Sequence, residues 1–183
     1  IFLIIVFVIS SYEWQSISKN KYYLFFGYLF LLFSVFSVFQ IRFSFGNNYL
    51  PLFTITIICI LTDIGGYVFG KLFKGPKLTK YSPNKTYAGS IGSFILALCL
   101  TPFIIYYQMI NYFNVFQLIF FILIISLVSQ IGDIIISYYK RAANIKDTGN
   151  LIPGHGGLLD RIDGMLFVFP VSYFFMLTNF FRQ

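Results

Sequence analysis

The sequence predicts an all-α fold, that of a polytopic helical integral membrane protein. Hydrophobic residues make up 58% of the 183 residues and charged residues only 10%, against about 25% charged residues in soluble domains. Apolar runs close to the ~20 residues that cross a bilayer as a helix recur along the chain. A surface so poor in charge would not stay in water. A soluble core protein is therefore excluded, and lipid is the expected solvent.

The apolar runs predict about five full spans, plus a truncated span at the N-terminus, in one membrane-embedded domain over residues 1–183. The first run, residues 1–11, is too short to cross a bilayer and is expected to be the second half of a span whose beginning is missing. Full spans are expected at residues 22–41, 49–70, 87–108, 114–138 and 162–181. The segments between them, of which 12–21 is the first, are expected to be loops.

Basic residues gather in alternate loops. Segments 12–21, 71–86 and 139–161 hold two, five and four of the 13 Lys and Arg residues, while Arg42 and Arg182 lie on the other side. Because basic loops of membrane proteins stay in the cytoplasm, these three segments are predicted to face it, in the inner membrane of a bacterium. The same rule explains the net charge of +7, and no nucleic-acid-binding motif accompanies that charge.

Two acidic residues, Asp63 and Asp133, lie inside predicted spans. An ionisable group in a span costs several kcal/mol (about 2.5–3.5 on insertion scales) unless it is paired, hydrated or metal-bound, so both are functional candidates. The alternative for each is a structural aspartate that accepts a hydrogen bond from a neighbouring helix. Glu13 falls in a predicted loop and is interpreted as an ordinary surface residue.

The span that ends near Lys140 carries a polar face. Asp133, Ser137, Lys140, Arg141 and Asn144 follow one another at the spacing of a single helical face. A carboxylate suits a hard divalent cation, and the two cations suit phosphate oxygens. A snorkelling Lys–Arg pair at the membrane surface is the alternative for the cations, but it leaves the aspartate unexplained.

The following segment breaks the helix with one proline and three glycines between Asn150 and Asp163. Glycines let backbone N–H groups approach an anion closely. Asp160 and Asp163 then share one face at the start of the last span, at a spacing that lets them share a metal ion. His155 is the single histidine and cannot form a zinc site alone. A phosphate contact is the expectation for it, and a structural role is the alternative.

A second polar region lies around the predicted span at residues 49–70 and the loop after it. Gly66 and Gly70 form a G-x-x-x-G step on the same helical face as the span's aspartate, and helix packing alone would explain them. Lys85 is expected at the membrane surface, within reach of an anionic head group, although topology signalling would explain most lysines of this loop. Ser82 or Thr86 is expected to cap the next helix.

Together these features predict chemistry at phosphorus at the cytoplasmic edge of a bilayer. Carboxylates with magnesium, combined with Lys and Arg side chains, are the groups that phosphoryl and nucleotidyl transfer require. A site embedded in a membrane implies that one substrate is a lipid.

Residues 137–163, within a signature region of 133–163, closely resemble the signature of the phosphatidate cytidylyltransferases, S-x-x-K-R-x4-K-D-x-G-x2-I-P-x-H-G-G-x-x-D-R-x-D. The matching positions are Ser137, Lys140, Arg141, Lys146, Asp147, Gly149, Ile152, Pro153, His155, Gly156, Gly157, Asp160, Arg161 and Asp163. Residues 62–70 and 82–86 resemble a second conserved region of that family, and the resemblance covers roughly residues 50–181. Tyr139 and Ala88 depart from its pattern.

The resemblance implies that CTP and phosphatidate give CDP-diacylglycerol and diphosphate in a magnesium-dependent reaction, with a second cation left open. It implies a catalytic set of Asp133, Lys140, Arg141, Asp160 and Asp163, in which the three aspartates bind the metal. It implies substrate contacts from Asp63, Ser82, Lys85, Ser137, Lys146, Asp147, His155, Gly156, Gly157 and Arg161. The expected partners are CTP, phosphatidate and the bilayer, without nucleic acid, and a homodimer is one possible assembly.

Three other functions fit part of the pattern. A CTP-dependent polyprenol kinase, or a cytidylyltransferase for a different lipid, would retain most of these motifs. An ion-coupled transporter would spread its acids across the membrane midplane, whereas here they cluster toward one face. A catalytically inactive scaffold would have lost signature carboxylates, and none is lost here.

Overall fold

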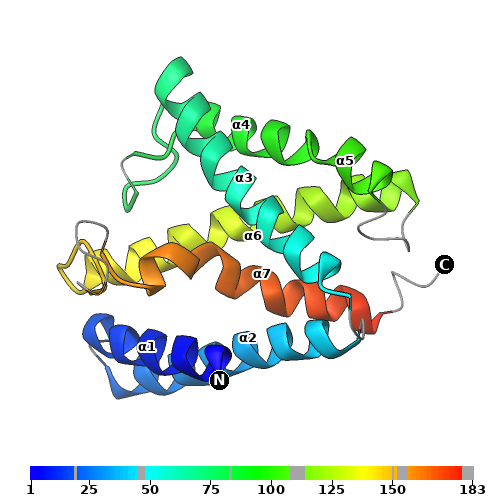
Figure 1. Ribbon diagram of the computed structural model, residues 1–183. Coiled ribbons are helices and arrows are strands. Elements are labelled where there is room, and N and C mark those ends of the chain that lie inside the picture. Colours follow the sequence, from blue (N-terminus) through cyan, green and yellow to red (C-terminus); the bar gives the residue numbers. More distant parts are fainter. Residues whose placement is uncertain are drawn as a thin grey trace.

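The computed structural model describes residues 1–18, 20–44, 48–82, 84–107, 114–149, 151 and 156–178. The described part of the chain forms helices joined by short segments (Figure 1). In chain order these are α1 (Phe2–Ile17), α2 (Lys21–Ser44), α3 (Leu50–Phe73), α4 (Tyr87–Leu98), α5 (Thr101–Tyr106), α6 (Val115–Ala142) and α7 (Leu159–Leu177). Within these ranges there is no β-strand, and an isolated bridge joins Lys77 and Thr86. The all-α prediction is confirmed.

Helices α6 and α7 lie against each other in the middle of the bundle. Helix α2 packs on α7, α1 packs on α2, and α3 packs on α4, α6 and α7. One buried cluster fills the space between α3, α4, α6 and α7, with Ile58, Phe121, Ile122 and Ile125 at its centre. The outward faces carry many exposed aromatic and aliphatic side chains, which is the arrangement that lipid contact requires.

Four helical stretches are long and apolar enough to cross a membrane: α2, α3, α4 with α5, and α6. They correspond to four of the five predicted full spans. Helix α7 corresponds to the fifth and lies in the bundle beside α2 and α6, but its first turns carry Asp160, Arg161 and Asp163. These charges place the start of α7 at the polar edge of the bundle. The chain is a polytopic helical integral membrane protein.

The predicted span at 87–108 is divided in two. Helix α4 ends at Leu98, and α5 begins at Thr101 with Pro102 in its first turn. Proline has no backbone N–H and favours the first turn of a helix, so the chain turns and restarts there.

Helices α3 and α4 approach closely through glycines. A Cβ atom added at Gly65 would lie 2.6 Å from the carbonyl oxygen of Gly92, and one at Gly89 would lie 2.6 Å from that of Gly66. Any larger side chain at these positions would push the two backbones apart. Cβ atoms at Gly66 and Gly70, the two positions of the G-x-x-x-G step, would lie 3.9 and 3.7 Å from backbone atoms of Gly89, so its interpretation as a packing surface is confirmed.

The prediction of a loop over residues 12–21 is wrong for most of that segment. Helix α1 continues to Ile17, and α2 already begins at Lys21. Glu13, Trp14 and Ile17 are only 3%, 7% and 2% exposed, so Glu13 is not a surface residue. The physical reason is that this last turn of α1 packs inward, under the segment that joins α6 to α7.

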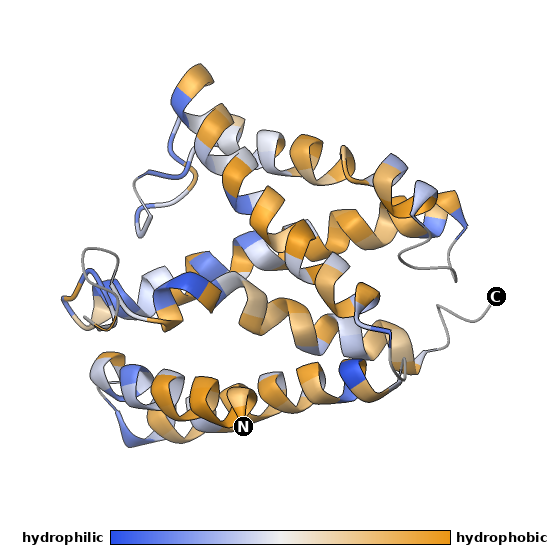
Figure 2. Ribbon diagram, in the orientation of Figure 1, coloured by the Kyte–Doolittle hydropathy of each residue, from blue (hydrophilic) through white to orange (hydrophobic). Residues whose placement is uncertain are grey.

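Three chain segments meet at one end of the bundle (Figure 1). The turn between α1 and α2, the segment between α3 and α4, and the segment between α6 and α7 all lie at the left of this view. Figure 2 shows hydrophilic residues concentrated at the same end, next to the predominantly hydrophobic helices. The fold therefore gathers the two motif regions at one edge of the membrane domain.

Candidate active site

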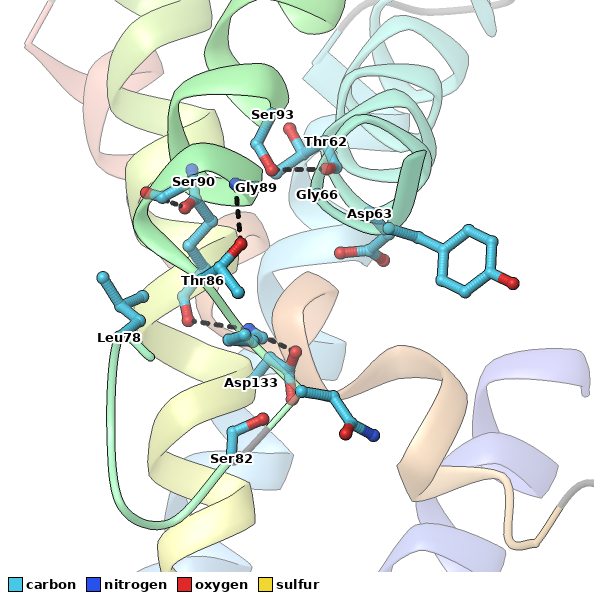
Figure 3. A pocket seen from close by; sticks show the side chains of 14 residues that line it. Thr62, Asp63, Gly66, Leu78, Ser82, Thr86, Gly89, Ser90, Ser93 and Asp133 are labelled. Atoms are coloured by element: carbon cyan, nitrogen blue, oxygen red, sulfur yellow. Dashed lines mark hydrogen bonds and ion pairs between the residues drawn. The ribbon is translucent and has the colours of Figure 1, made fainter. Parts of the chain in front are cut away.

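A pocket of about 270 Å³ lies between α3, α4, α6 and the segment 74–86 (Figure 3). Most of the side chains that line it carry a polar or charged group. The polar residues that line it are Thr62, Asp63, Tyr67, Ser82, Asn84, Lys85, Thr86, Ser90, Ser93, Gln130 and Asp133. Three predicted substrate contacts, Asp63, Ser82 and Lys85, thus share one pocket with the predicted metal ligand Asp133.

Lys85 and Asp133 form an ion pair inside this pocket, and their side chains are 25% and 27% exposed. The Nζ atom of Lys85 also donates to the backbone carbonyl of Gln130 at 3.4 Å. Ser137, one helical turn further along α6, donates to Asp133 Oδ1 at 3.3 Å. The lysine is therefore turned into the bundle, toward α6.

A tight turn holds Lys85 in this position. Its backbone N–H donates to the carbonyl of Ser82 at 3.1 Å, and its own carbonyl accepts from the N–H of Leu78 at 2.8 Å. Thr86 follows as the N-cap of α4, and its Oγ1 accepts from the N–H of Gly89 at 3.1 Å. The capping prediction is confirmed for Thr86, the second of its two candidates.

Three carboxylates interact electrostatically around this pocket. Asp63 on α3 and Asp133 on α6 both line it, and each contributes to the electrostatic environment of Asp163 near the start of α7. Lys85 and Lys140 lie close enough to offset part of this negative charge. Negative charges on these side chains repel one another, and a bound cation would reduce that repulsion.

Asp160 belongs to a separate set of contacts. Its Oδ1 atom accepts from Lys140 Nζ at 2.9 Å, and its Oδ2 accepts from the N–H groups of Thr148 and Gly157, both at 2.9 Å. These donors satisfy both carboxylate oxygens. Asp160 therefore holds the segment between α6 and α7 against the end of α6.

Glu13, from the far end of the sequence, holds the same segment on its other side. Its Oε1 accepts from the N–H of Leu158 at 2.9 Å. Its Oε2 accepts from the N–H of Leu159 at 2.6 Å and from the Oγ1 of Thr148 at 3.1 Å. Sequence reasoning missed this residue. The available signal was that Glu13 is the single glutamate of the chain and stands beside its single tryptophan, Trp14.

The remaining predicted cations lie at the same end of the bundle. Arg141 is exposed and donates from Nε to the carbonyl of Tyr81 at 3.4 Å. The rings of Tyr81 and Tyr138 meet edge to face, with 4.9 Å between their centroids. These contacts join the segment 74–86 to the end of α6. Lys146, Asp147 and Arg161 are exposed around the segment between α6 and α7.

The glycine turn is described only in part. His155, with residues 150 and 152–154, lies outside the described residues, so its predicted phosphate contact is not placed. Gly156 has a φ of +86°, which favours glycine, and a Cβ atom there would lie 2.7 Å from Asp160 Oδ2. Gly156 therefore packs closely against the Asp160 carboxylate.

The model of the cytidylyltransferase family matches residues 1–179 of this chain. The chain belongs to the cytidylyltransferase family. It is similar to the phosphatidate cytidylyltransferase of Staphylococcus aureus (strain COL), with 39% identity over 180 residues that cover 94% of this chain and 67% of the relative. It is also similar to that of Staphylococcus haemolyticus (strain JCSC1435), with 37% identity over 172 residues, covering 90% and 64%. The chain thus spans about two thirds of the length of these curated relatives.

The match to the cytidylyltransferase family begins at residue 1 and extends beyond the region 50–181 in which motifs were recognised. It includes α1 and α2, so Glu13 lies within the family's matched domain. The contacts of Glu13 with Thr148 and Leu159 therefore join two parts of one domain.

The carboxylates of this member of the cytidylyltransferase family suit a hard cation, on the condition that further ligands come from outside the chain. Among the residues that the structure describes, no three Asp, Glu, His or Cys side chains form a group that could hold a metal ion by themselves. Asp133 and Asp163 share one negative region with Asp63, whereas Asp160 is engaged by Lys140 and two N–H groups. Phosphate oxygens of a substrate would have to complete the coordination of magnesium. Metal binding by Asp133, Asp160 and Asp163 stays a prediction.

Proposed function

We propose that this chain carries the catalytic site of a phosphatidate cytidylyltransferase, which converts CTP and phosphatidate into CDP-diacylglycerol and diphosphate. The observation that carries the proposal is a pocket between membrane helices in which Lys85 and Asp133 are paired, next to the Lys140–Asp163 motif. The similarity to staphylococcal phosphatidate cytidylyltransferases supports the choice of substrates.

The pocket suits the lipid substrate. It lies between membrane helices, so a lipid can present its phosphate there while its acyl chains stay in the bilayer. We assign Lys85 and Ser82 to the phosphatidate head group, with Asp63 facing it from α3. Lys85 would exchange its contact with Asp133 for a contact with the lipid phosphate.

The other end of the site suits a nucleoside triphosphate. Lys140, Arg141, Lys146 and Arg161 are assigned to the phosphates of CTP, together with Ser137 and Asp147 in supporting positions. The glycine turn at His155, Gly156 and Gly157 completes this half of the site. These groups lie at the end of the bundle that we place in the cytoplasm of a bacterium, where CTP is available.

The reaction needs little proton transfer. A phosphate oxygen of phosphatidate attacks the α-phosphorus of CTP, the bond from that phosphorus to the bridging oxygen breaks, and diphosphate leaves with the bond's electrons. The attacking oxygen is already ionised near neutral pH, which agrees with a site that has a single histidine in its sequence.

The main obstacle is repulsion between two anionic substrates. Two unit charges 4 Å apart repel by about 4 kcal/mol at an effective dielectric constant of ~20, and several such pairs arise here. The lysines and arginines offset part of this energy. Magnesium, held by Asp133 and Asp163 with Asp160 and substrate oxygens, would supply the remaining neutralisation; a second cation is left open.

The deciding experiment follows two phosphorus labels of CTP in the purified protein in phospholipid vesicles. Label from the α-phosphorus should enter the lipid only with phosphatidate and magnesium present, while label from the γ-phosphorus should leave as diphosphate. A lipid labelled from the γ-phosphorus would identify a CTP-dependent lipid kinase and overturn the proposal. No label in lipid from either position, in protein that remains folded, would also contradict it.

A further inference from the structure

We propose that Glu13 is a positioning residue for the reaction: its carboxylate fixes the segment between α6 and α7 in the geometry that binds the phosphates of CTP. This inference rests on the proposed function, because it assigns that segment to CTP. It names a residue from the opposite end of the sequence, outside both recognised motifs.

Two carboxylates close the neck of this segment, which we define as Thr148 together with Gly157, Leu158 and Leu159. Asp160 accepts from the N–H groups of Thr148 and Gly157. Glu13 accepts from the hydroxyl group of Thr148 and from the N–H groups of Leu158 and Leu159.

The carboxylate of Glu13 is buried, and the groups that donate to it are neutral. Glu13 is 3% exposed. Its carboxylate accepts hydrogen bonds from two backbone N–H groups at the start of α7 and from one hydroxyl group. The N-terminus of a helix stabilises negative charge, so the start of α7 suits this carboxylate. Burying a carboxylate without such donors costs free energy. Because the donors are divided between both of its oxygens, the contact is specific for an acceptor with two oxygens.

Two glycines of the motif make room for Glu13. A Cβ atom at Gly157 would lie 2.6 Å from the Cδ atom of Glu13, and one at Gly149 would lie 3.0 Å from its Oε1. Both positions belong to the motif that resembles the family signature. A side chain at either glycine would collide with the Glu13 carboxylate, which explains why both positions are glycine.

A second contact from α1 reinforces the first. The Oγ atom of Ser16 donates to the carbonyl of Thr148 at 3.0 Å. Thr148 is thus held through its N–H by Asp160, through its hydroxyl by Glu13, and through its carbonyl by Ser16. The last turn of α1 acts as a platform for the neck.

The neck determines where two of the phosphate-binding cations stand. Lys146 precedes Thr148 by two residues, and Arg161 follows Leu159 by two residues. Releasing the neck would let both cations move away from the triphosphate. The lipid head group is assigned to Lys85 and Ser82 on the other side of the site, so its binding should change little.

The test compares Glu13→Gln with a control that weakens the fold elsewhere. Glutamine has only one acceptor oxygen. Its NH₂ group would therefore face one of the N–H or O–H donors that now donate to the carboxylate. Ser34→Ala removes the hydrogen bond from Ser34 Oγ to the carbonyl of Leu166, 2.8 Å long and buried between α2 and α7. Both variants lose a buried polar contact, but only the first loses it at the neck.

We expect Glu13→Gln to raise the KM for CTP about tenfold, the factor of one charge-assisted hydrogen bond, and to leave the KM for phosphatidate within about twofold. Amide hydrogen exchange of Leu158 and Leu159 should accelerate by about tenfold or more for the same reason. Ser34→Ala should lower the melting temperature and leave both KM values and these two amides unchanged.

The outcomes separate the two proposals. If the wild-type protein does not form CDP-diacylglycerol, the proposed function fails and this inference fails with it. If the wild type is active and Glu13→Gln keeps both KM values, the inference alone is wrong. Equal changes in both KM values, or the same pattern in Ser34→Ala, would reduce Glu13 to a residue that only stabilises the fold and would also overturn the inference.

Discussion

The ion pair between Lys85 and Asp133 allows its structural and catalytic roles to be separated by a double-mutant cycle. Lys85→Met removes the ammonium group but keeps an unbranched apolar chain, and Asp133→Asn keeps the shape of the carboxylate without its charge. Each single change leaves one charge of the pair without its partner inside the bundle. The double variant leaves no unpaired charge.

The burial of the pair sets the size of the effect. Breaking a buried pair costs about 3–5 kcal/mol and breaking an exposed pair about 0–1 kcal/mol. The two side chains are 25% and 27% exposed, so each single variant should lose about 2 kcal/mol of unfolding free energy. That corresponds to a fall of about 4–8 °C in Tm for a chain of this size. The double variant should recover at least half of the summed loss.

Thermal unfolding of the protein in detergent measures the stability, and transfer of labelled cytidylate to lipid measures the activity. Stability should recover in the double variant while activity stays lost, because both side chains are assigned to substrate or metal. Lys80→Met, at an exposed lysine of the same segment, is the control and should change stability by less than about 0.5 kcal/mol. Losses that add within about 0.5 kcal/mol would refute the ion pair, and an active double variant would refute both catalytic assignments.

Three further predictions follow from the same contacts. Asp163→Asn should abolish turnover while expression and Tm stay close to wild type, since its carboxylate is assigned to magnesium; substantial residual activity would contradict that role. Gly89→Ala should lower the unfolding free energy by about 1–3 kcal/mol, because its methyl group would meet the carbonyl of Gly66, and an unchanged Tm would count against the close packing of α3 on α4. Thr148→Ala should raise the KM for CTP several-fold, by about the factor of one hydrogen bond, whereas Thr148→Ser retains the hydroxyl group and should behave as wild type; equal kinetics in the two variants would exclude a role for the hydroxyl.

Hydropathy and short motifs predicted most of the helices and their approximate bounds. The helices lie close to the predicted spans because a bilayer requires long apolar helices whatever their side-chain detail. The step at Gly66 and Gly70 and the cap at Thr86 were also predictable, since both depend on neighbours in the sequence or on backbone contact alone. The break between α4 and α5 was missed, although Pro102 marks it.

The predictions of the site were weaker where contacts join distant residues. Lys85 was expected within reach of a lipid head group, but its ion pair with Asp133, 48 positions away along the chain, was not predicted. Glu13 was interpreted as a surface residue because it falls in a segment that was predicted to be a loop. Its burial depends on donors more than 130 residues later, which local pattern cannot show.

The path of the neck also sets an order of events during synthesis. Glu13 and Leu159 are 146 residues apart, and a ribosome adds about 5–20 residues each second. For roughly 7–30 seconds after Glu13 is made, the N–H groups that will receive its carboxylate do not yet exist. Helix α1 must therefore enter the membrane with this carboxylate still hydrated or protonated. The neck, and with it the half of the site that we assign to CTP, is among the last parts of the chain to assemble.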